Sequence, residues 1–321
     1  MKRLLLILSM KPNILVGGQA VIEGVMMRVP GAYSTAVRCP NGDIKIKRKE
    51  FSSITEHSIL WSKPIFRGIA SLYEAMKMGM STLQWSADIS YPEESSEGIL
   101  SKIMDIMTTI FSITLAISLF MVLPMWLTTK LLSIEKEALW FNISSGVFRI
   151  IFFVVYLFLI SKMKDIARLF QYHGAEHKVV YNFESGNDLS VAEAQSFPTQ
   201  HPRCGTSFMF IVLLSAIFVF AIVDTIIIYY FGTISLSTRL LFHLPLIPLV
   251  SGIGYELIKI TSKNDLLIFQ ILKAPGILLQ NITTKQPDDK MIEVSIAALK
   301  DAFGDEYDNF VGKKYTAEAI G

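Results

Sequence analysis

The chain has 321 residues, of which 51% are hydrophobic and only 18% are charged, and its mean hydropathy is +0.44. A typical soluble domain carries about 25% charged residues. The deficit is concentrated in residues 106–123 and 207–223, which contain no charged side chain. Because about 20 apolar residues cross the hydrocarbon core of a membrane, these runs exclude a purely soluble protein. A formal net charge of +2 is too small to indicate a nucleic-acid partner.

The first residues resemble the beginning of a signal peptide. Met1–Arg3 carry positive charge and precede the apolar run Leu4–Leu8. This run is shorter than the apolar region of about 7–15 residues found in signal peptides, and no cleavage site with small residues follows it. We therefore predict that the segment is not cleaved.

The apolar sequence divides into four predicted membrane spans. The second span is the shortest, and its start can extend back to Leu139. The fourth contains two prolines and two glycines, so we expect a kinked helix that packs inside the bundle, where neighbours satisfy the freed backbone groups. The spans are predicted at residues 106–132, 147–161, 207–231 and 240–260.

The distribution of lysine and arginine predicts the orientation of these spans. The N-terminal region, the loop at residues 162–206 and the C-terminal tail together contain 26 of the 30 basic residues, and the other two connections contain the remaining four. Basic loops stay on the cytoplasmic side of a membrane. Both termini and the 162–206 loop are therefore expected in the cytoplasm.

The N-terminal region is predicted to contain a β-hairpin and an amphipathic helix. Two strand-like runs, Tyr33–Arg38 and Ile44–Lys49, flank Asn41-Gly42, which is a strong hairpin signal. Apolar residues recur at helical spacing over residues 64–86. This pattern fits a helix in the membrane interface or against the bundle, and it fits a soluble core helix equally well. Residues 91–98 are expected to form a linker.

The C-terminal region is predicted to contain two further helices. Residues 266–279 are apolar, interrupted by Ala274-Pro275-Gly276 and too short to cross a membrane, so we expect them in the interface. Residues 288–303 begin with acidic residues that can cap a helix, and their apolar spacing predicts a short surface helix.

The predicted fold is mainly α: a polytopic α-helical membrane protein with about four spans, interfacial amphipathic helices and a small N-terminal β-hairpin region. Its predicted parts are a cytoplasmic N-terminal region at 1–98, a four-span membrane domain at 99–260 with a cytoplasmic His/Cys loop at 162–206, and cytoplasmic interfacial and C-terminal helices at 261–321.

The strongest chemical signal is the sequence His173-Gly174-Ala175-Glu176-His177. On a helix, two histidines four positions apart face the same side and can share a metal ion. The order H-x-x-E-H is the inverted form of a zinc-protease signature, in which the glutamate acts as the general base. We therefore predict Glu176 as the catalytic residue.

A second pair of ligand-type residues, His201 and Cys204, immediately precedes the third span. Since His173 follows the second span, both motifs lie at the same membrane edge. The two cysteines, Cys39 and Cys204, are too few for a disulfide framework. We predict a divalent metal, zinc, bound by His173, His177, His201 and Cys204. Four protein ligands would make the site structural and three would leave a catalytic position, whereas a polar loop with histidines bonded to backbone carbonyls is the competing interpretation.

Further polar residues interrupt apolar segments. Residues 16–28 are glycine-rich, but they match neither a dinucleotide fingerprint nor a P-loop, which excludes a nucleotide site. Within them, Glu23 and Arg28 are expected either to form a buried ion pair or to extend the metal site. Glu256 in the fourth span can face the metal site or pair with a neighbouring lysine. Asp224 inside the third span is a functional candidate, or it caps polar groups there.

Four blocks of the sequence resemble the YqhQ family of bacterial membrane proteins, in the order that the family has them. The family is described as predicted metal-dependent enzymes of undefined reaction, so the resemblance implies a multi-pass protein of the inner (plasma) membrane that binds a metal. It extends from about Val16 to Lys300. The chain departs from the family at Arg28-Val29-Pro30, where a glycine is usual in place of the valine. The blocks are residues 17–28, 173–178, 201–207 and 274–289.

Two functions fit these observations. The first is a zinc-dependent, membrane-embedded hydrolase with a cytoplasm-facing site that acts on a peptide or lipid, in which His173, His177 and either His201 or Cys204 hold the ion. The second is a non-enzymatic, metal-stabilised membrane scaffold that binds a membrane-protein partner. A transporter fits less well, because four spans without an internal repeat are few for that class. The number of protein ligands distinguishes the first two functions.

Overall fold

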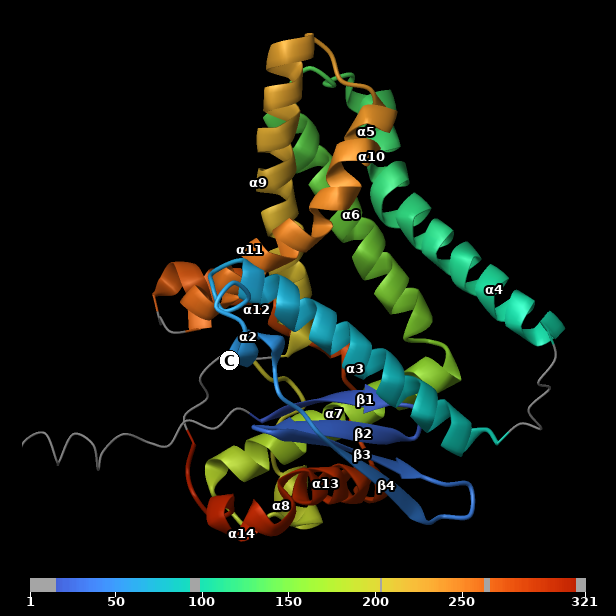
Figure 1. Ribbon diagram of the computed structural model, residues 1–321, viewed down its shortest axis with the longest axis vertical. Coiled ribbons are helices and arrows are strands. Elements are labelled where there is room, and N and C mark those ends of the chain that lie inside the picture. The colour runs from blue at the N-terminus through green and yellow to red at the C-terminus, as the bar shows by residue number, and fades with distance from the viewer. Residues whose placement is uncertain (1–15, 93–98, 203, 263–265, 316–321) are drawn as a thin grey trace, which may run out of the picture.

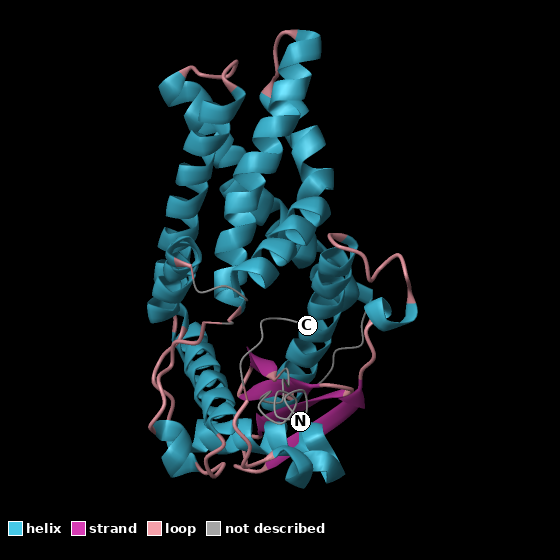
Figure 2. Cartoon of the chain, turned by 90° about the vertical axis from the view of Figure 1, so that its left-hand side faces the viewer, coloured by secondary structure: helices cyan, strands magenta, loops and turns pink. Residues whose placement is uncertain are grey.

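The computed structural model describes residues 16–92, 99–202, 204–262 and 266–315. The molecule is elongated, with a bundle of long helices at one end and a small sheet covered by helices at the other (Figures 1 and 2). The predicted signal-like segment and most of the predicted linker at residues 91–98 lie outside the described residues.

The sheet is larger than the predicted hairpin. It is an antiparallel meander in the order β1-β2-β3-β4, in which β3 and β4 form the predicted hairpin. The glycine-rich segment adds the other two strands, which a two-residue turn at Ile22-Glu23 connects. Glu23 adopts a φ of 52° there. The strands are β1 (Gly17–Val21), β2 (Gly24–Val29), β3 (Ala32–Arg38) and β4 (Ile44–Glu50).

Helices cover both faces of this sheet. Because side chains alternate along a strand, Val25 and Met27 of β2 belong to the core formed with α7 (Lys164–Ser185) and α13 (Asp289–Phe303). Met26 points the other way and packs with Met78 of α3 (Phe66–Ser90), the predicted amphipathic helix. Figure 1 shows α3 running obliquely between the sheet and the bundle.

The C-terminal helix α13 begins and ends where it was predicted, but the extent of its burial was not predicted. The carboxylate of Asp288 accepts a hydrogen bond from the backbone N–H of Met291 at 2.9 Å and caps the helix. Ile292 and Leu299 are completely buried against the sheet, so the prediction of a surface helix is wrong for this face. The short helices around it are α2 (Ile54–His57), α8 (Val191–Gln195), η3 (Gly304–Glu306) and α14 (Tyr307–Phe310).

Four helical segments are long and apolar enough to cross a membrane, at Ile106–Leu132, Ala138–Ile160, Phe208–Phe231 and Leu236–Thr261. They confirm the four predicted spans and the earlier start of the second. The fourth, for which the sequence predicted a kink, contains a 3-10 turn with a proline. The elements are α4 (Ile99–Ile117), η1 (Ser118–Val122), α5 (Leu123–Leu132), α6 (Ala138–Ile160), α9 (Gly205–Phe231), α10 (Leu236–His243), η2 (Leu244–Leu246) and α11 (Ile247–Ser262).

The first span differs from the others in its packing. Helix α4 extends away from the bundle, and its apolar side chains, including Ile110 and Phe111, are exposed (Figure 1). It joins the bundle through the π-helical turn η1. A π turn changes the local backbone hydrogen-bonding pattern, and here the Phe120 carbonyl accepts a hydrogen bond from Arg149 Nε of α6 at 2.8 Å.

The apolar C-terminal segment forms one continuous helix, α12 (Leu267–Thr283), with Pro275 inside it. The predicted interruption at Ala274-Pro275-Gly276 is therefore wrong. Proline removes one helical hydrogen bond, but the helix continues and buries Gly276 and Gln280 beyond it. The end of α12 thereby reaches the residues around the two sequence motifs.

Candidate metal centre

Three segments that are distant in sequence meet beside the sheet. Helix α7 carries His173, Glu176 and His177, and Thr199, His201 and Cys204 precede α9. The end of α12 closes the third side. Gln280 of α12 holds the loop with two hydrogen bonds to the backbone of His201, one to its N–H at 2.6 Å and one to its carbonyl oxygen at 2.8 Å.

Three side chains place their ligand atoms together. The described His, Cys, Asp and Glu residues include one group suited to a metal ion, formed by His173, His177 and Cys204, whose ligand atoms all lie within 4.8 Å of one another. His173 Nε2 lies 3.2 Å from Cys204 Sγ. Ligand atoms of one tetrahedral zinc, with nitrogen about 2.0 Å and sulfur about 2.3 Å from the metal, lie about 3.5 Å apart. The three residues therefore form a candidate metal site.

Backbone carbonyls orient both imidazole rings. His173 Nδ1 lies 2.8 Å from the carbonyl oxygen of Thr283, and His177 Nδ1 is hydrogen-bonded to the carbonyl oxygen of Thr199. A carbonyl only accepts, so each Nδ1 carries the proton and each Nε2 keeps its lone pair. Ligating histidines are commonly oriented in this way. The carbonyl bonds that the competing interpretation invoked are thus compatible with metal binding.

Cys204 lies at the beginning of α9. It is the N-cap residue of this helix and is buried. The hydroxyl of Thr206 lies 3.4 Å from its sulfur and donates a hydrogen bond to it. The thiolate is the form of cysteine that ligates metals.

His201 lies next to the three-residue cluster and contacts different groups. Its Nε2 is 3.8 Å from a carboxylate oxygen of Glu184, and its ring packs against that of Tyr181 with centroids 4.3 Å apart. Its ring centroid lies 5.6 Å from that of His177. The structure thus brings three of the four predicted ligands into one group and places the fourth at its edge.

Glu176 is buried beside the cluster. One of its carboxylate oxygens lies 3.5 Å from His177 Nε2, the atom that would hold the metal. The carboxylate therefore lies within reach of a group bound next to the ligands, which is where a general base is needed.

Burial favours the neutral form of His177 and of His201. It lowers the pKa of His177, and it lowers the pKa of His201 to about 4. A neutral imidazole is the form that ligates a metal.

One supporting feature, the set of hydrogen bonds made by Lys178, escaped the sequence analysis. Lys178 Nζ donates hydrogen bonds to the carbonyl oxygens of Gln195 at 2.8 Å and Phe197 at 2.5 Å, which fixes the loop before Thr199. Burial lowers the pKa of this lysine. Like the carbonyls that orient the histidines, these acceptors are backbone groups, so no residue type in the sequence marks them.

The predicted ion pair between Glu23 and Arg28 does not form. Glu23 lies in the turn between β1 and β2, where it pairs with Arg168 of α7 and accepts a hydrogen bond from the Tyr172 hydroxyl at 3.3 Å. Arg28 lies at the opposite end of the same hairpin, paired in register with Gly17. The hairpin separates the two residues, and neither belongs to the three-residue cluster.

The polar residues of the spans also have partners outside the cluster. Glu256 accepts hydrogen bonds from Arg67 Nε at 2.7 Å and from the Ile65 backbone N–H at 3.2 Å, so it links α11 to α3. Asp224 is completely buried within the bundle and pairs with Arg239 and His243.

Comparisons with known proteins give a family without an assigned activity. Residues 63–305 match the model of a family described as protein of unknown function, DUF1385. The chain is 30% identical over 303 residues to the uncharacterized protein YqhQ of Bacillus subtilis strain 168, and the match covers 89% of this chain and 91% of that protein. No solved structure matches the chain.

Proposed function

Because the chain belongs to the DUF1385 family, whose function is unknown, we propose its function from its own site: a zinc-dependent hydrolase embedded in the membrane. His173, His177 and Cys204 hold the ion, and Glu176 is the general base. The substrate is a lipid or peptide at the membrane surface. Under the positive-inside rule, the site faces the cytoplasm of a bacterial cell.

The observation that carries this proposal is the arrangement of two imidazoles and one thiol with their ligand atoms within 4.8 Å of one another. Three protein ligands leave a coordination position open in tetrahedral zinc, which is typical of catalytic sites, whereas structural sites have four. The two carbonyl bonds support the same assignment, because they direct the Nε2 atoms of His173 and His177 into the cluster.

The residues divide the chemistry among them. A zinc ion held by His173, His177 and Cys204 would supply Lewis-acid activation of water and of the scissile carbonyl or phosphoryl group. Glu176 accepts the proton of the attacking water and then returns it to the leaving group. The Glu176 side chain is buried, so bulk solvent is excluded from the space around its carboxylate.

Metal content and turnover together test the proposal. We expect the purified wild-type protein to contain one zinc per chain, and His177→Ala and Cys204→Ser to lose it, because each removes a ligand. Glu176→Gln keeps the size of the side chain and should keep the metal. Its hydrolysis of total membrane lipids or membrane peptides should fall about 10²–10⁴-fold, the usual contribution of a general base. His57→Ala, which removes an exposed histidine, is the control.

The zinc content of the His201→Ala variant distinguishes an enzyme from a metal-stabilised scaffold. If the site has three ligands, this variant retains zinc. Zinc loss in His201→Ala would indicate a closed, four-ligand site and would overturn the hydrolase in favour of a metal-stabilised scaffold. Loss of zinc in Glu176→Gln would make this residue a ligand and overturn its role as base, and unchanged metal in both ligand variants would overturn the metal site itself.

A further inference from the structure

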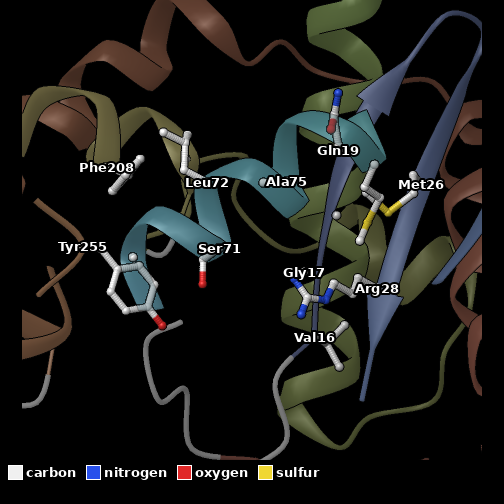
Figure 3. Close-up of a pocket in the computed structure, with 14 residues that line it drawn as sticks. Val16, Gly17, Gln19, Met26, Arg28, Ser71, Leu72, Ala75, Phe208 and Tyr255 are labelled. Carbon is white, nitrogen blue, oxygen red and sulfur yellow. The ribbon is translucent and has the colours of Figure 1, made fainter. Parts of the chain in front are cut away.

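A cavity of about 300 Å³ lies between α3 and the β1–β2 hairpin. Figure 3 shows its two sides, with Ser71, Leu72 and Ala75 on α3 and Arg28 extending from β2. Most of the lining is apolar. This volume is at the lower end of the range of about 300–1,000 Å³ that is typical of small-molecule sites.

Arg28 is the charged group in this cavity. Its guanidinium stacks over the ring of Phe51, 4.3 Å from the centroid. Within the described part of the chain, no carbonyl or carboxylate accepts a hydrogen bond from it. Burial lowers the pKa of Arg28, whereas the nearby carboxylates of Glu74 and Glu56 act in the opposite direction without accepting a hydrogen bond from it. Its donors are therefore available to an anionic ligand.

The cavity lies where the spans meet the sheet. Phe208 is the first residue of the third span, Tyr255 lies near the end of the fourth, and both line the cavity. Along α3, the side chains of Tyr73, Met76 and Met80 are exposed apolar groups. An apolar helix face next to the ends of membrane spans is typical of an interfacial helix, which lies among lipid headgroups.

The cavity also adjoins the candidate metal centre. Gly205, in its wall, directly follows the ligand Cys204. On the other side lies Gly18, where an added Cβ would stand 2.9 Å from Cγ of Glu176. Gly18 is thus the residue that separates a group bound in the cavity from the side chain of Glu176.

We propose that this cavity binds the headgroup of an anionic membrane phospholipid, with Arg28 contacting the phosphate and the apolar wall holding the beginning of an acyl chain. The further step, that such a lipid is the substrate of the metal centre, rests on the proposed function. A planar guanidinium matches two phosphate oxygens, and an apolar wall matches a chain, so the two features together select a phosphate-bearing lipid over a peptide.

Lipid binding to the purified full-length protein tests this proposal directly. In native mass spectrometry from detergent, we expect the wild-type protein to retain dioleoyl phosphatidylglycerol and to bind dioleoylglycerol, which has the same chains without the phosphate, at least about tenfold more weakly. Arg28→Gln should weaken phosphatidylglycerol binding by a similar factor, whereas Arg28→Lys should retain part of it because the charge remains. Lys45→Gln removes a charge from an exposed position of the same sheet and should have no effect.

A second variant keeps Arg28 and fills the cavity. Ala75 lies on α3 at the cavity wall, so Ala75→Trp should block phosphatidylglycerol binding while zinc content and melting temperature stay at their wild-type values. If inorganic phosphate displaces bound phosphatidylglycerol as effectively as added phosphatidylglycerol does, the cavity is a site for free phosphate. This result would overturn the lipid assignment. Equal binding of phosphatidylglycerol and dioleoylglycerol, or binding unchanged in both variants, would overturn the proposal as well.

The lipid assay is repeated after metal removal with a chelator. Failure of the lipid site can then be distinguished from failure of the zinc-dependent hydrolase. Phosphatidylglycerol binding by protein that never takes up zinc would support the lipid site and overturn the hydrolase. Zinc binding without phosphatidylglycerol binding would overturn the lipid site and leave the hydrolase in place. Binding of both, with no hydrolysis of phosphatidylglycerol, would overturn the lipid as substrate.

Discussion

Gly174, between the two motif histidines of α7, lies against the chain that follows α12. A Cβ at this position would stand 2.1 Å from the carbonyl oxygen of Lys285, two residues beyond the Thr283 carbonyl that orients His173. We predict that Gly174→Ala pushes this backbone away and lowers zinc affinity by about 10–100-fold, the usual effect of losing an outer-shell partner. Titration with a competing chelator measures this change.

A matched glycine provides the control. Gly205 follows Cys204 directly, and an added Cβ would meet no atom within 4 Å. Gly205→Ala should therefore leave zinc affinity unchanged. Equal affinity in both variants would show that the Thr283 carbonyl does not set the orientation of His173.

The sequence predicts the side chains of the centre better than its geometry. The spacing of His173 and His177 and the ligand-type residue Cys204 pointed to the cluster that the structure brings together, but the sequence did not distinguish Cys204 from His201 as the third member. The carbonyls of Thr199 and Thr283 were not predictable, because every residue has one and only the fold determines where it points. Glu23 was assigned the wrong partner for a related reason, since its place in a turn depends on strand register.

At the scale of single elements, α13 joins the sheet to α7. Leu299 is completely buried in the core that these elements share. We predict that Leu299→Ala destabilises this part of the molecule by about 2–5 kcal/mol, because it leaves a cavity in a packed core. Urea unfolding followed by limited proteolysis measures the loss. Lys290→Ala, at an exposed position of the same helix, should change stability by less than about 0.5 kcal/mol.

The boundaries of helices could be predicted from the periodicity of their apolar residues. Which helix faces are buried, and whether a helix continues through a proline, depends on the elements that pack against it. The apolar spacing of α13 indicates a helix with one apolar face, but the sequence does not name the surface that covers it. The sheet that does so includes β1 and β2, whose glycines and short length gave no strand prediction. Similarly, Pro275 is compatible with a helix when the residues beyond it are held by packing, which no local rule predicts.

At the scale of the whole molecule, a buried polar cluster links three helices of the bundle. Asp224 of α9 accepts hydrogen bonds from Asn142 Nδ2 of α6 at 2.7 Å and from Arg239 Nε of α10 at 2.8 Å, and it lies 2.9 Å from Nε2 of His243. Arg239 also stacks on the ring of Phe141, 3.4 Å from its centroid.

Removing the carboxylate leaves the buried guanidinium without its anion. We predict that Asp224→Ala destabilises the bundle by about 3–5 kcal/mol, the usual cost of breaking a buried ion pair on one side. The melting temperature in detergent measures the effect. Thr225→Ala, the neighbouring residue whose hydroxyl bonds within its own helix, should melt close to the wild type. A small effect of Asp224→Ala would show that water reaches Arg239.

The orientation of the whole molecule in the membrane decides which compartment the candidate metal centre faces. The basic residues concentrate on the side that carries the sheet and the candidate metal centre, and the positive-inside rule predicts that this side faces the cytoplasm. Asn187 lies in the loop between α7 and α8 on that side, and Thr233 lies in the loop between α9 and α10 at the other end of the spans (Figure 1). Both residues are exposed.

We therefore predict that a membrane-impermeant maleimide added to intact cells labels a cysteine at Thr233 and does not label one at Asn187. The native Cys39 and Cys204 are buried, so the unmodified protein gives the background. In permeabilised cells both introduced cysteines should react, which shows that each is accessible once the barrier is removed. Labelling of Asn187→Cys alone in intact cells would place the metal centre outside the cytoplasm, because the centre and this loop belong to the same layer of the molecule.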